Sequence, residues 1–471
     1  MKILKPYFAM GCFVMLLSAC SVGKKYTRAE LGTPEQYRND VSLTGDSINM
    51  PWKTFFKDPM LIGLIEKALD KNSEIAVAVQ TMQQLENTYK QAKLTLLPTA
   101  DLAVSANRNW LSKNSLNGSL SEQFLGTPYM DDYSATLSVS WEADIWGKAK
   151  MQKEGALADY FAQKENLSAL KTRMVVQLAQ AYYNLISLDE EMKVARRNVI
   201  LGDSTLAMIN LQYNAAQVNS LAVEQAKAQK KTAELLVPLA LQNIAIQENA
   251  IRILCGEFPS SVERAGNLAS FAPETKFSTG VPAQLLSKRP DLKAAEFAVV
   301  SANAKTGLAK AAMYPTISIT PSIGANSFQF NTWFNLPGSL VKNLGANISQ
   351  PLFRKKALKT AYENALIDQQ KAAIQFKQQM LTAVGEVSDA LAKAKYADER
   401  MELVTEKNAS LAKATKDALL LYRNGMATYL EVITAQNTAL QSDLEAIGIK
   451  RDKLNAITDL YRALGGGVEK E

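Results

Sequence analysis

The 471-residue sequence contains no histidine and only three cysteines. The lack of histidine removes the side chain that most often serves as a general base or a metal ligand near neutral pH. The cysteines are Cys12, Cys20 and Cys255, and the first two lie in a processed N-terminal segment described below. One free cysteine in the mature chain permits no intramolecular disulfide, no cysteine-based zinc site and no Cys/His nucleophile pair. We therefore expect no enzyme activity, no metal and no cofactor.

The N-terminus has the three parts of a cleavable secretory signal. Lys2 and Lys5 precede an apolar segment at 7–17, and Leu-Ser-Ala-Cys follows at 17–20. The arrangement resembles a bacterial lipoprotein signal, which implies removal of residues 1–19 and acylation of Cys20, with palmitate among the acyl chains. By the same resemblance, Ser21 after the cysteine implies sorting to the outer membrane.

Long apolar runs and basic blocks are both missing from the rest of the chain. After residue 20, no segment approaches the ~20 apolar residues of a membrane helix. Without Lys2 and Lys5 the chain has 51 basic and 46 acidic residues, and this mild excess is spread along the sequence. We expect no nucleic-acid partner. The chain is either wholly periplasmic or crosses the membrane as β-strands.

Four segments have the alternating pattern of β-strands. The first half contains TADLAVSANRNW at 99–110 and YSATLSVSWE at 133–142. The second half contains TISITPSIGAN at 316–326 and a weaker segment near 344–348. Each has the length of a tilted transmembrane strand, although a half-buried soluble sheet shows the same alternation. The long polar stretch at 111–132 is interpreted as a loop.

One pair of carboxylates invites a catalytic hypothesis. Glu142 and Asp144 are two positions apart at the end of a strand pattern, which predicts that they share one face. A water-filled lumen next to that face is the simpler explanation of the pair.

Very long helical patterns follow the strand pairs. Apolar residues keep an unbroken 3/4 spacing from 167 to 199, and a similar pattern runs from 380 to 404. A helix from about 149 to 213 would be roughly 98 Å long at 1.5 Å per residue. Pro238 should interrupt the returning helix and kink it.

The sequence contains an internal repeat. Residues 211–229 and 420–438 match at Leu211/Leu420, Tyr213/Tyr422 and, further on, at leucine, valine and alanine pairs. The strand entries Leu-Pro-Thr at 97–99 and Tyr-Pro-Thr at 314–316 give a second correspondence. The repeat predicts hairpin turns at 213–220 and 422–429, with a left-handed helix stop at Asn424-Gly425. It rejects Gly202-Asp203 as a turn, because the counterpart 411–412 lies inside a helical pattern.

Four strands cannot close a barrel in a membrane, where about eight is the minimum. Unpaired strand edges in lipid cost several kcal/mol each. Transmembrane strands would therefore have to be pooled from several copies of the chain, and the arithmetic alone allows two, three or four.

The chain resembles the TolC-like outer-membrane efflux channels, in particular the lipoprotein branch that serves resistance–nodulation–division pumps. The resemblance covers the whole mature length and depends on five segments in order. They are WKTFFKDP at 52–59, SWEADIWGK at 140–148, PAQLLSKRPDLKAAE at 282–296, QPLF at 350–353 and LYRALGGG at 460–467.

This resemblance implies a mainly α fold. Long helical hairpins from three copies would form a periplasmic α-barrel, continuous with a 12-stranded outer-membrane β-barrel to which each chain gives four strands. The implied divisions are the signal peptide 1–19, an N-terminal anchor and equatorial segment 20–70, a first repeat 71–255, an equatorial connector 256–288, a second repeat 289–464 and a tail 465–471.

The resemblance also implies the roles of individual residues. Glu431 would form a ring of three carboxylates at a periplasmic gate, with Tyr422 and Arg423 holding neighbouring hairpins together. Thr434 and Ala427 stand where family members often carry acids, so a second ring is not expected. The tip residues that an adaptor would contact are Ala216, Gln217, Val218, Asn219, Gly425, Met426, Ala427 and Thr428.

The function implied is that of a passive exit duct. It would be lipid-anchored in the outer membrane, extend into the periplasm, and open when a periplasmic adaptor and an inner-membrane pump engage it. Two alternatives remain: a protein-export duct as in type I secretion, and a periplasmic coiled-coil scaffold lipoprotein.

Overall fold

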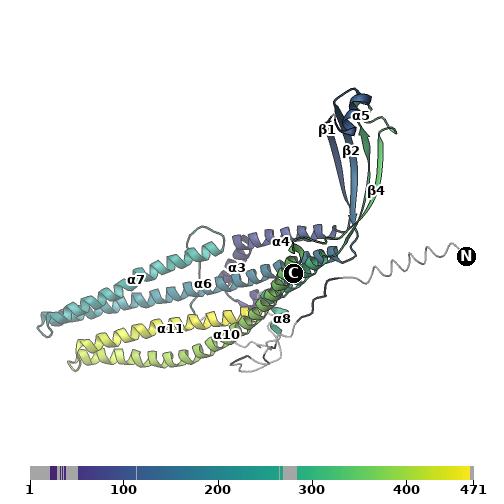
Figure 1. The fold of residues 1–471 in the computed structure, drawn as a ribbon. Coiled ribbons are helices and arrows are strands. Elements are labelled where there is room, and N and C mark those ends of the chain that lie inside the picture. Colours follow the sequence, from purple (N-terminus) through teal and green to yellow (C-terminus); the bar gives the residue numbers. More distant parts are fainter. Residues whose placement is uncertain are drawn as a thin grey trace. The chain divides into compact units, whose positions relative to one another are not determined.

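The computed structural model describes residues 22–28, 32, 34, 37–38, 51–112, 114–264, 266–268 and 284–466 (Figure 1). Cys20, the predicted signal segment, and residues 269–283 and 467–471 lie outside the described residues. The elements in chain order are α2 Trp52–Phe55, α3 Pro59–Lys71, α4 Ser73–Lys93, β1 Thr99–Trp110, α5 Leu116–Leu125, β2 Tyr129–Glu142, α6 Lys148–Asn214, α7 Ser220–Leu254, α8 Leu285–Lys288, α9 Pro290–Ala311, β3 Thr316–Ser327, the 3-10 helix η3 Phe330–Thr332, β4 Leu340–Ser349, α10 Ala357–Arg423 and α11 Tyr429–Ala463.

The predicted repeat is present in the bounds of these elements. Helix α6 matches α10 and helix α7 matches α11 with both bounds displaced by 209 residues (148 to 357, 214 to 423, 220 to 429, 254 to 463). Strand β1 matches β3 with a displacement of 217 residues at both ends (99 to 316, 110 to 327). The change from 217 to 209 falls between the strands of each pair, as the sequence predicts.

The chain divides into two compact units, and each unit takes matching parts of both repeats. The sheet unit consists of the described parts of Met1–Ala29, with Gln83–Phe161 and Phe297–Ile374. The hairpin unit consists of the described parts of Glu30–Met82, Ala162–Glu296 and Gln375–Glu471.

The sheet unit contains one antiparallel sheet in the order β1-β2-β3-β4. Its register places most apolar positions of the strands in common rows: Leu102 lies opposite Leu137, Leu137 opposite Ile323, and Pro321 opposite Leu344. Lys342, opposite Ile323, is the charged residue that β4 adds to this face. The rows between them pair Asp101 with Ser138 and Ser138 with Ser322. Because side chains alternate between the faces of a strand, one face is mainly apolar and the other consists largely of Ser, Thr and Asn, with a few acids. The alternation predicted from the sequence is confirmed.

Two predictions about the sheet are wrong. The stretch between β1 and β2 is not a simple loop, because it contains α5, whose first turn is capped by the Ser115 hydroxyl accepting from Gly118 N. Glu142 and Asp144 do not share a strand face, because β2 ends at Glu142. Glu142 pairs with Lys148 at 3.1 Å, and the Asp144 carboxylate accepts from Ala149 N and Lys150 N at the start of α6.

The hairpin unit has its main core where the short helices α2 and α3 pack on α6 and on the end of α11. Phe55 stacks on Tyr461 with ring centroids 4.0 Å apart, and Asp58 both caps α3 and accepts from the Tyr182 hydroxyl at 2.7 Å. Gly466 lies so close that a Cβ there would be 2.5 Å from the Tyr461 ring. Through Tyr461, these contacts bring the aromatic segment at 52–59 and the start of the glycine-rich end into one core.

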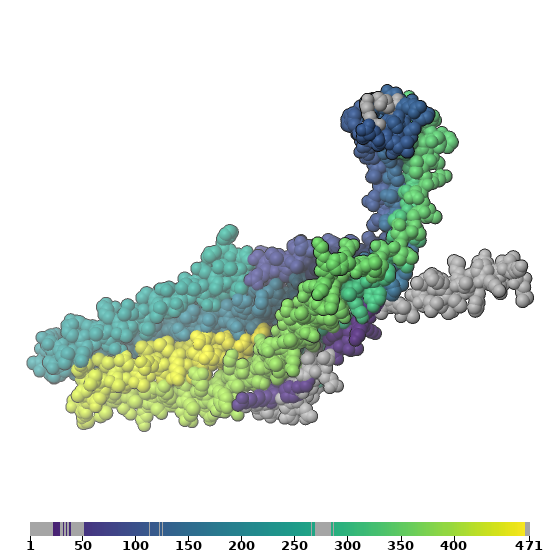
Figure 2. Space-filling model, in the orientation of Figure 1, coloured from purple at the N-terminus to yellow at the C-terminus, as the bar shows by residue number. Residues whose placement is uncertain are grey.

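The rest of this unit consists of α7, α11 and the longer parts of α6 and α10, from Ala162 and Gln375 onward. Helix α11 lies beside α10 and the first hairpin, α6–α7 (Figures 1 and 2). Lys407 of α10 bonds Glu445 of α11 at 2.9 Å, and Arg197 of α6 pairs with Asp443 of α11. Helix α7 runs through Pro238 without a break, so the proline does not interrupt it. No helix in the described residues is both long and apolar enough to span a membrane.

Candidate functional sites: the hairpin tips and a buried charge cluster

Both hairpin turns are Schellman motifs, in which one residue takes a left-handed conformation and the chain closes by a six-to-one hydrogen bond. In the second turn Gly425 has φ +72° and Met426 N donates to Leu421 O at 2.9 Å. In the first turn the equivalent residue is Ala216, with φ +56°, and Gln217 N donates to Gln212 O at 2.8 Å. The predicted helix stop at Gly425 is confirmed. An L-residue pays about 1–2 kcal/mol for this conformation, so local chemistry did not point to Ala216.

The returning helices are capped by side chains from the predicted tip. The Asn219 side-chain oxygen Oδ1 accepts from Ala222 N at 3.2 Å. In the second hairpin, the Glu431 carboxylate accepts from Thr428 N at 2.6 Å, which is one half of a capping box. Glu431 thus has a local partner at the start of α11, and its predicted gate role stays a prediction.

The two tips lie together and line an open cleft of about 670 Å³. The Tyr422 hydroxyl donates to the Gln212 side-chain oxygen of the other hairpin, and Tyr429 packs on the small apolar cluster around Ile209. Burial, followed by the nearby Tyr429, raises the pKa of Tyr422. The cavity is lined by Gln212, Gln217, Val218, Asn219, Ala222, Tyr422, Arg423, Gly425, Ala427, Thr428 and Tyr429. Of the predicted tip and gate residues, Ala216, Met426 and Glu431 are not in this lining.

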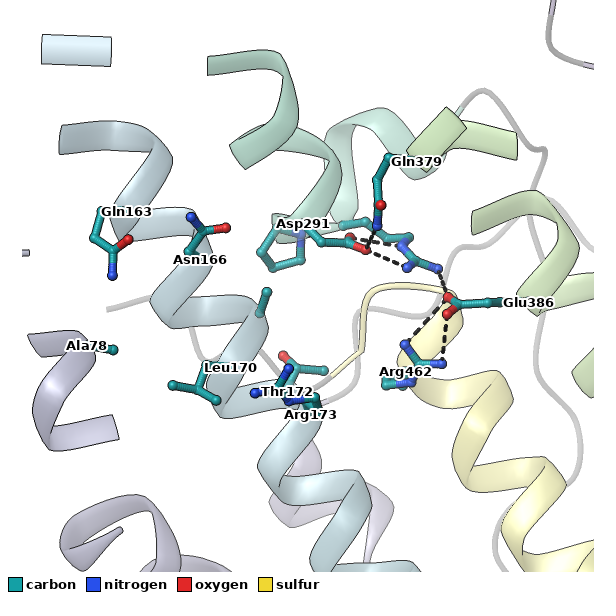
Figure 3. Close-up of a pocket in the computed structure, with 13 residues that line it drawn as sticks. Ala78, Gln163, Asn166, Leu170, Thr172, Arg173, Asp291, Gln379, Glu386 and Arg462 are labelled. Atoms are coloured by element: carbon teal, nitrogen blue, oxygen red, sulfur yellow. Dashed lines mark hydrogen bonds and ion pairs between the residues drawn. The ribbon is translucent and has the colours of Figure 1, made fainter. Parts of the chain in front are cut away.

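Further along the hairpin unit, a charge cluster surrounds Arg289, which is 3% exposed. Asp291, Glu386 and Arg462 of this cluster are labelled in Figure 3. The Arg289 guanidinium bonds both oxygens of Asp291, at 3.0 and 2.6 Å, and Glu386 at 2.7 Å. It also donates to the Ala463 carbonyl at 3.2 Å, while Glu386 accepts a second guanidinium from Arg462. The cluster therefore joins the start of α9, the middle of α10 and the end of α11.

The electrostatics of the cluster favour the charged forms. Burial opposes ionisation of Arg289, but the carboxylates of Asp291 and Glu386 outweigh it and raise its pKa. Burial would likewise raise the pKa of Asp291, but hydrogen bonds from Arg289 and Gln379 lower it overall. A cavity of about 460 Å³ beside the cluster is lined by Arg173 and Leu170 of α6, among others.

The first repeat has an equivalent of the Arg289–Ala463 contact, with a single hydrogen bond and no charges. Asn72, which corresponds to Arg289 (72 to 289), donates to the Leu254 carbonyl at 2.9 Å, and Leu254 corresponds to Ala463 (254 to 463). The sequence shows the Arg-Pro-Asp segment, but nothing in it pointed to partners 97 to 174 residues away. The order Arg-Pro-Asp does indicate the start of a helix at Pro290, because proline and an acidic residue are both favoured in the first turn of a helix.

In the described part of the chain, no three His, Cys, Asp or Glu side chains are grouped to hold a metal ion. Cys255 is buried, its thiol contacts the Leu64 carbonyl at 3.5 Å, and burial raises its pKa to about 11. The residues provide two hairpins whose tips are joined through Tyr422 and Gln212, and whose returning helices are bonded at their ends by Asn72 and Arg289.

The chain is similar over nearly its whole length to proteins of known type. It is 27% identical to the cation efflux system protein CusC of Escherichia coli O6:H1, over 98% of each chain. A solved structure of CusC, 26% identical, superposes with a TM-score of 0.85 over 95% of this chain and 100% of that one. The solvent efflux pump outer membrane protein SrpC of Pseudomonas putida is 28% identical over 98% of this chain and 97% of its own length.

The lipoprotein interpretation also has a counterpart among the relatives. The probable outer membrane lipoprotein SilC of Salmonella typhimurium is 25% identical over 96% of this chain and 97% of its own length. The comparisons favour an efflux duct over the scaffold and the protein-export alternatives. The fold class predicted from the sequence, with four strands per chain and long helical hairpins, is confirmed. Residues 64–257 and 281–466 match the family described as "Outer membrane efflux protein", to which this chain belongs, and it forms the outer-membrane exit duct of a tripartite efflux pump.

Proposed function

We propose that three copies of the chain pool their sheets into one closed barrel and that the hairpin tips dock on the periplasmic adaptor of a resistance–nodulation–division pump. The sheet order leaves an edge of β1 and an edge of β4 unpaired within the described chain. Open edges are costly in lipid, and pairing β1 of one copy with β4 of the next removes them. Three such pairings give twelve strands. In this proposal the apolar face meets lipid, the polar face lines the lumen, and acylated Cys20 adds an anchor.

The adaptor contact is supported by one observation, the matched apolar residues that both tips expose. Leu211 and Leu420 correspond in the repeat, as do Leu221 and Leu430, and all four side chains are exposed. Met426 is 76% exposed at the turn itself. Grouped apolar side chains on a soluble surface indicate a protein-binding site. The proposed contact comprises these residues and the predicted tips 216–219 and 425–428.

The first test is Met426→Asp, which places a charge in the proposed apolar contact. We expect affinity for the adaptor of the chain's own pump to fall about tenfold or more, and efflux to fall with it. Binding of purified adaptor to the purified channel measures the effect. Met426→Leu, which keeps an apolar side chain, should bind like the wild type. Unchanged binding by Met426→Asp would remove this residue from the contact.

A gate at the tips is the second part of the proposal. Three Glu431 carboxylates around the pore would attract cations and repel one another. The hydrogen bond from Tyr422 to Gln212 joins the tips of the two hairpins within one chain. Loss of this bond would allow the two tips to separate. Arg423 lines the same cavity and, with Tyr422, would hold neighbouring hairpins together in the closed state. Opening then needs no chemistry, only an adaptor that binds the open state better.

Glu431→Gln separates the gate from the capping box. Glutamine keeps an oxygen that can accept from Thr428 N but has no charge, so the start of α11 should stay ordered. We expect the cation-over-anion permeability ratio in planar bilayers to fall towards one, with heat stability unchanged. Glu431→Ala loses both functions and should also loosen the tip. If Glu431→Gln keeps the wild-type ratio, the carboxylate serves only as a helix cap.

A further inference from the structure

The charged residues on the polar face of the sheet are all acids. The register places Asp101, Asp132 and Glu142 on this face, among side chains that are mostly Ser, Thr and Asn. The basic residues of the four strands are Arg108 and Lys342, and both alternate onto the apolar face. A solute that moves along the polar face therefore meets negative charge that no base of the strands compensates.

Asp101 is the acid of this face whose charge is free. Asp132 accepts a hydrogen bond from the Asn326 side chain at 2.6 Å, and Glu142 pairs with Lys148 at 3.1 Å. The Asp101 side chain is exposed and has no hydrogen bond or ion pair with the described residues. Its carboxylate is therefore available to interact with a passing ion.

Two glycines indicate that the polar face is the inner side of a curled sheet. Gly324 and Gly345 both lie on this face by the alternation of β3 and β4. A Cβ added to Gly324 would lie 2.4 Å from the Ala135 carbonyl oxygen of β2, and one added to Gly345 would lie 2.6 Å from Thr320 Oγ1 of β3. Groups converge on the concave side of a sheet, and glycines at such places allow the sheet to curl. The polar face is thus the one that closure into a barrel turns inward.

We propose that Asp101 makes the lumen of the pooled barrel selective for cationic solutes, in addition to the acid proposed at the tips. The inference rests on the proposed function, in which the polar face lines the lumen. Asp101 lies two residues after Thr99, where β1 begins, so three copies would place three carboxylates at one level near the end of the sheet that follows α4. The other residues of its row, Ser138, Ser322 and Asn343, are uncharged.

The width of the barrel decides the salt range in which such a ring acts. Twelve strands spaced about 4.8 Å apart and tilted about 40° form a wall about 24 Å in diameter. The carboxylates extend inward from this wall. Because the screening length is about 10 Å at 0.1 M salt and about 3 Å at 1 M, an ion on the axis feels the ring at the lower concentration only.

The charge at position 101 can be altered in the assembled channel with thiol reagents, because Cys255 is buried. The purified full-length Asp101→Cys variant is recorded in planar bilayers in a Glu431→Gln background, which removes the acid at the tips. We expect its cation-over-anion permeability ratio at 0.1 M salt to be at least about twofold below that of Glu431→Gln alone. Sulfonatoethyl methanethiosulfonate, which attaches a negative charge, should restore the ratio. Trimethylammonioethyl methanethiosulfonate, which attaches a positive charge, should lower it further, and all differences should disappear at 1 M salt.

Leu102→Cys is the matched control, because Leu102 is the next residue of β1 and lies on the apolar face. It should react with neither reagent, as mass spectrometry of the treated channel would show. Reaction at Asp101→Cys without a change in the ratio would overturn the role of Asp101 and leave the barrel intact. Reaction at Leu102→Cys but not at Asp101→Cys would contradict the lumen assignment and with it the proposed function. If Asp101→Cys forms no channel, Asp101→Asn, which keeps the shape of the side chain, decides by its ratio at the two salt concentrations.

Discussion

Replacement of Arg289 by methionine is expected to destabilise the hairpin unit by about 2–3 kcal/mol, because it removes a buried guanidinium that bonds two partly buried carboxylates. Asp291 would lose both of its bonds to the guanidinium, and Glu386 would keep only Arg462. The Ala463 carbonyl at the end of α11 would lose a donor as well. Heat denaturation of the purified channel, followed by circular dichroism, measures the loss as a lower Tm.

Arg173→Met is the control for this prediction. Arg173 lines the same cavity, but its side chain is 63% exposed and its partner Glu74 is 3.5 Å away. An exposed pair of this kind contributes between about 0 and 1 kcal/mol, so the Tm should hardly change. A triple variant that also replaces Asp291 and Glu386 by apolar residues should recover part of the stability lost in Arg289→Met. Equal effects of Arg289→Met and Arg173→Met would contradict the structural role of the cluster.

The same cluster predicts a dependence on acid. The folded-state pKa of Asp291 lies below its ordinary value of 3.8, so the ionised carboxylate stabilises the fold above that pH. This contribution is lost as the pH falls through the lowered folded-state pKa. The Tm difference between wild type and Arg289→Met should therefore be constant at neutral pH and should shrink below about pH 4.

The sequence predicted the positions of both hairpin turns because the repeat requires the two turns to correspond. The turn propensity of individual residues does not provide this information. Gly202-Asp203 has the composition of a turn, yet Gly202 lies inside α6, where a Cβ would be 3.4 Å from Lys230 Cα of α7. A Cβ at this distance would make an ordinary van der Waals contact with α7, and Gly202 continues the helix instead of ending it. Ala216 carries no turn signal but occupies the position of Gly425. Comparison of the two repeats, 209 residues apart, located both turns.

Residues joined over long distances in the chain were the ones that sequence patterns missed. Periodicity reports which face of an element is buried and says nothing of which other element covers it. Arg289 and Glu386 are 97 residues apart, so their pairing left no local signal. Helix α5 was missed for another reason, since its polar composition is typical of a loop. Its signals are a capping residue, Ser115, and a left-handed stop at Gly126, where φ is +70°.

Arginine substitutions at two neighbouring positions of β4, one on each face of the sheet, should have different effects on assembly. Leu344, 76% exposed within the single chain, lies opposite Pro321 on the apolar face. Asn343, one residue earlier, lies opposite Ser322 on the polar face. Arginine on the lipid side near the middle of a membrane costs about 2–4 kcal/mol, and a trimer would carry three such residues. We expect Leu344→Arg to form few channels in the outer membrane and Asn343→Arg to form nearly as many as the wild type.

The fraction of heat-resistant trimer in isolated outer membranes measures assembly in both variants. This fraction should fall for the variant on the apolar face and stay near the wild-type level for the variant on the polar face. Asn343→Arg should add three positive charges to the lumen and so lower the cation preference of the assembled channel. Assembly of Leu344→Arg at the wild-type level would mean that the apolar face does not meet lipid. Failure of both variants would indicate that β4 tolerates no bulk at this edge. Only loss at Leu344 with retention at Asn343 agrees with a sheet that faces lipid on one side and water on the other.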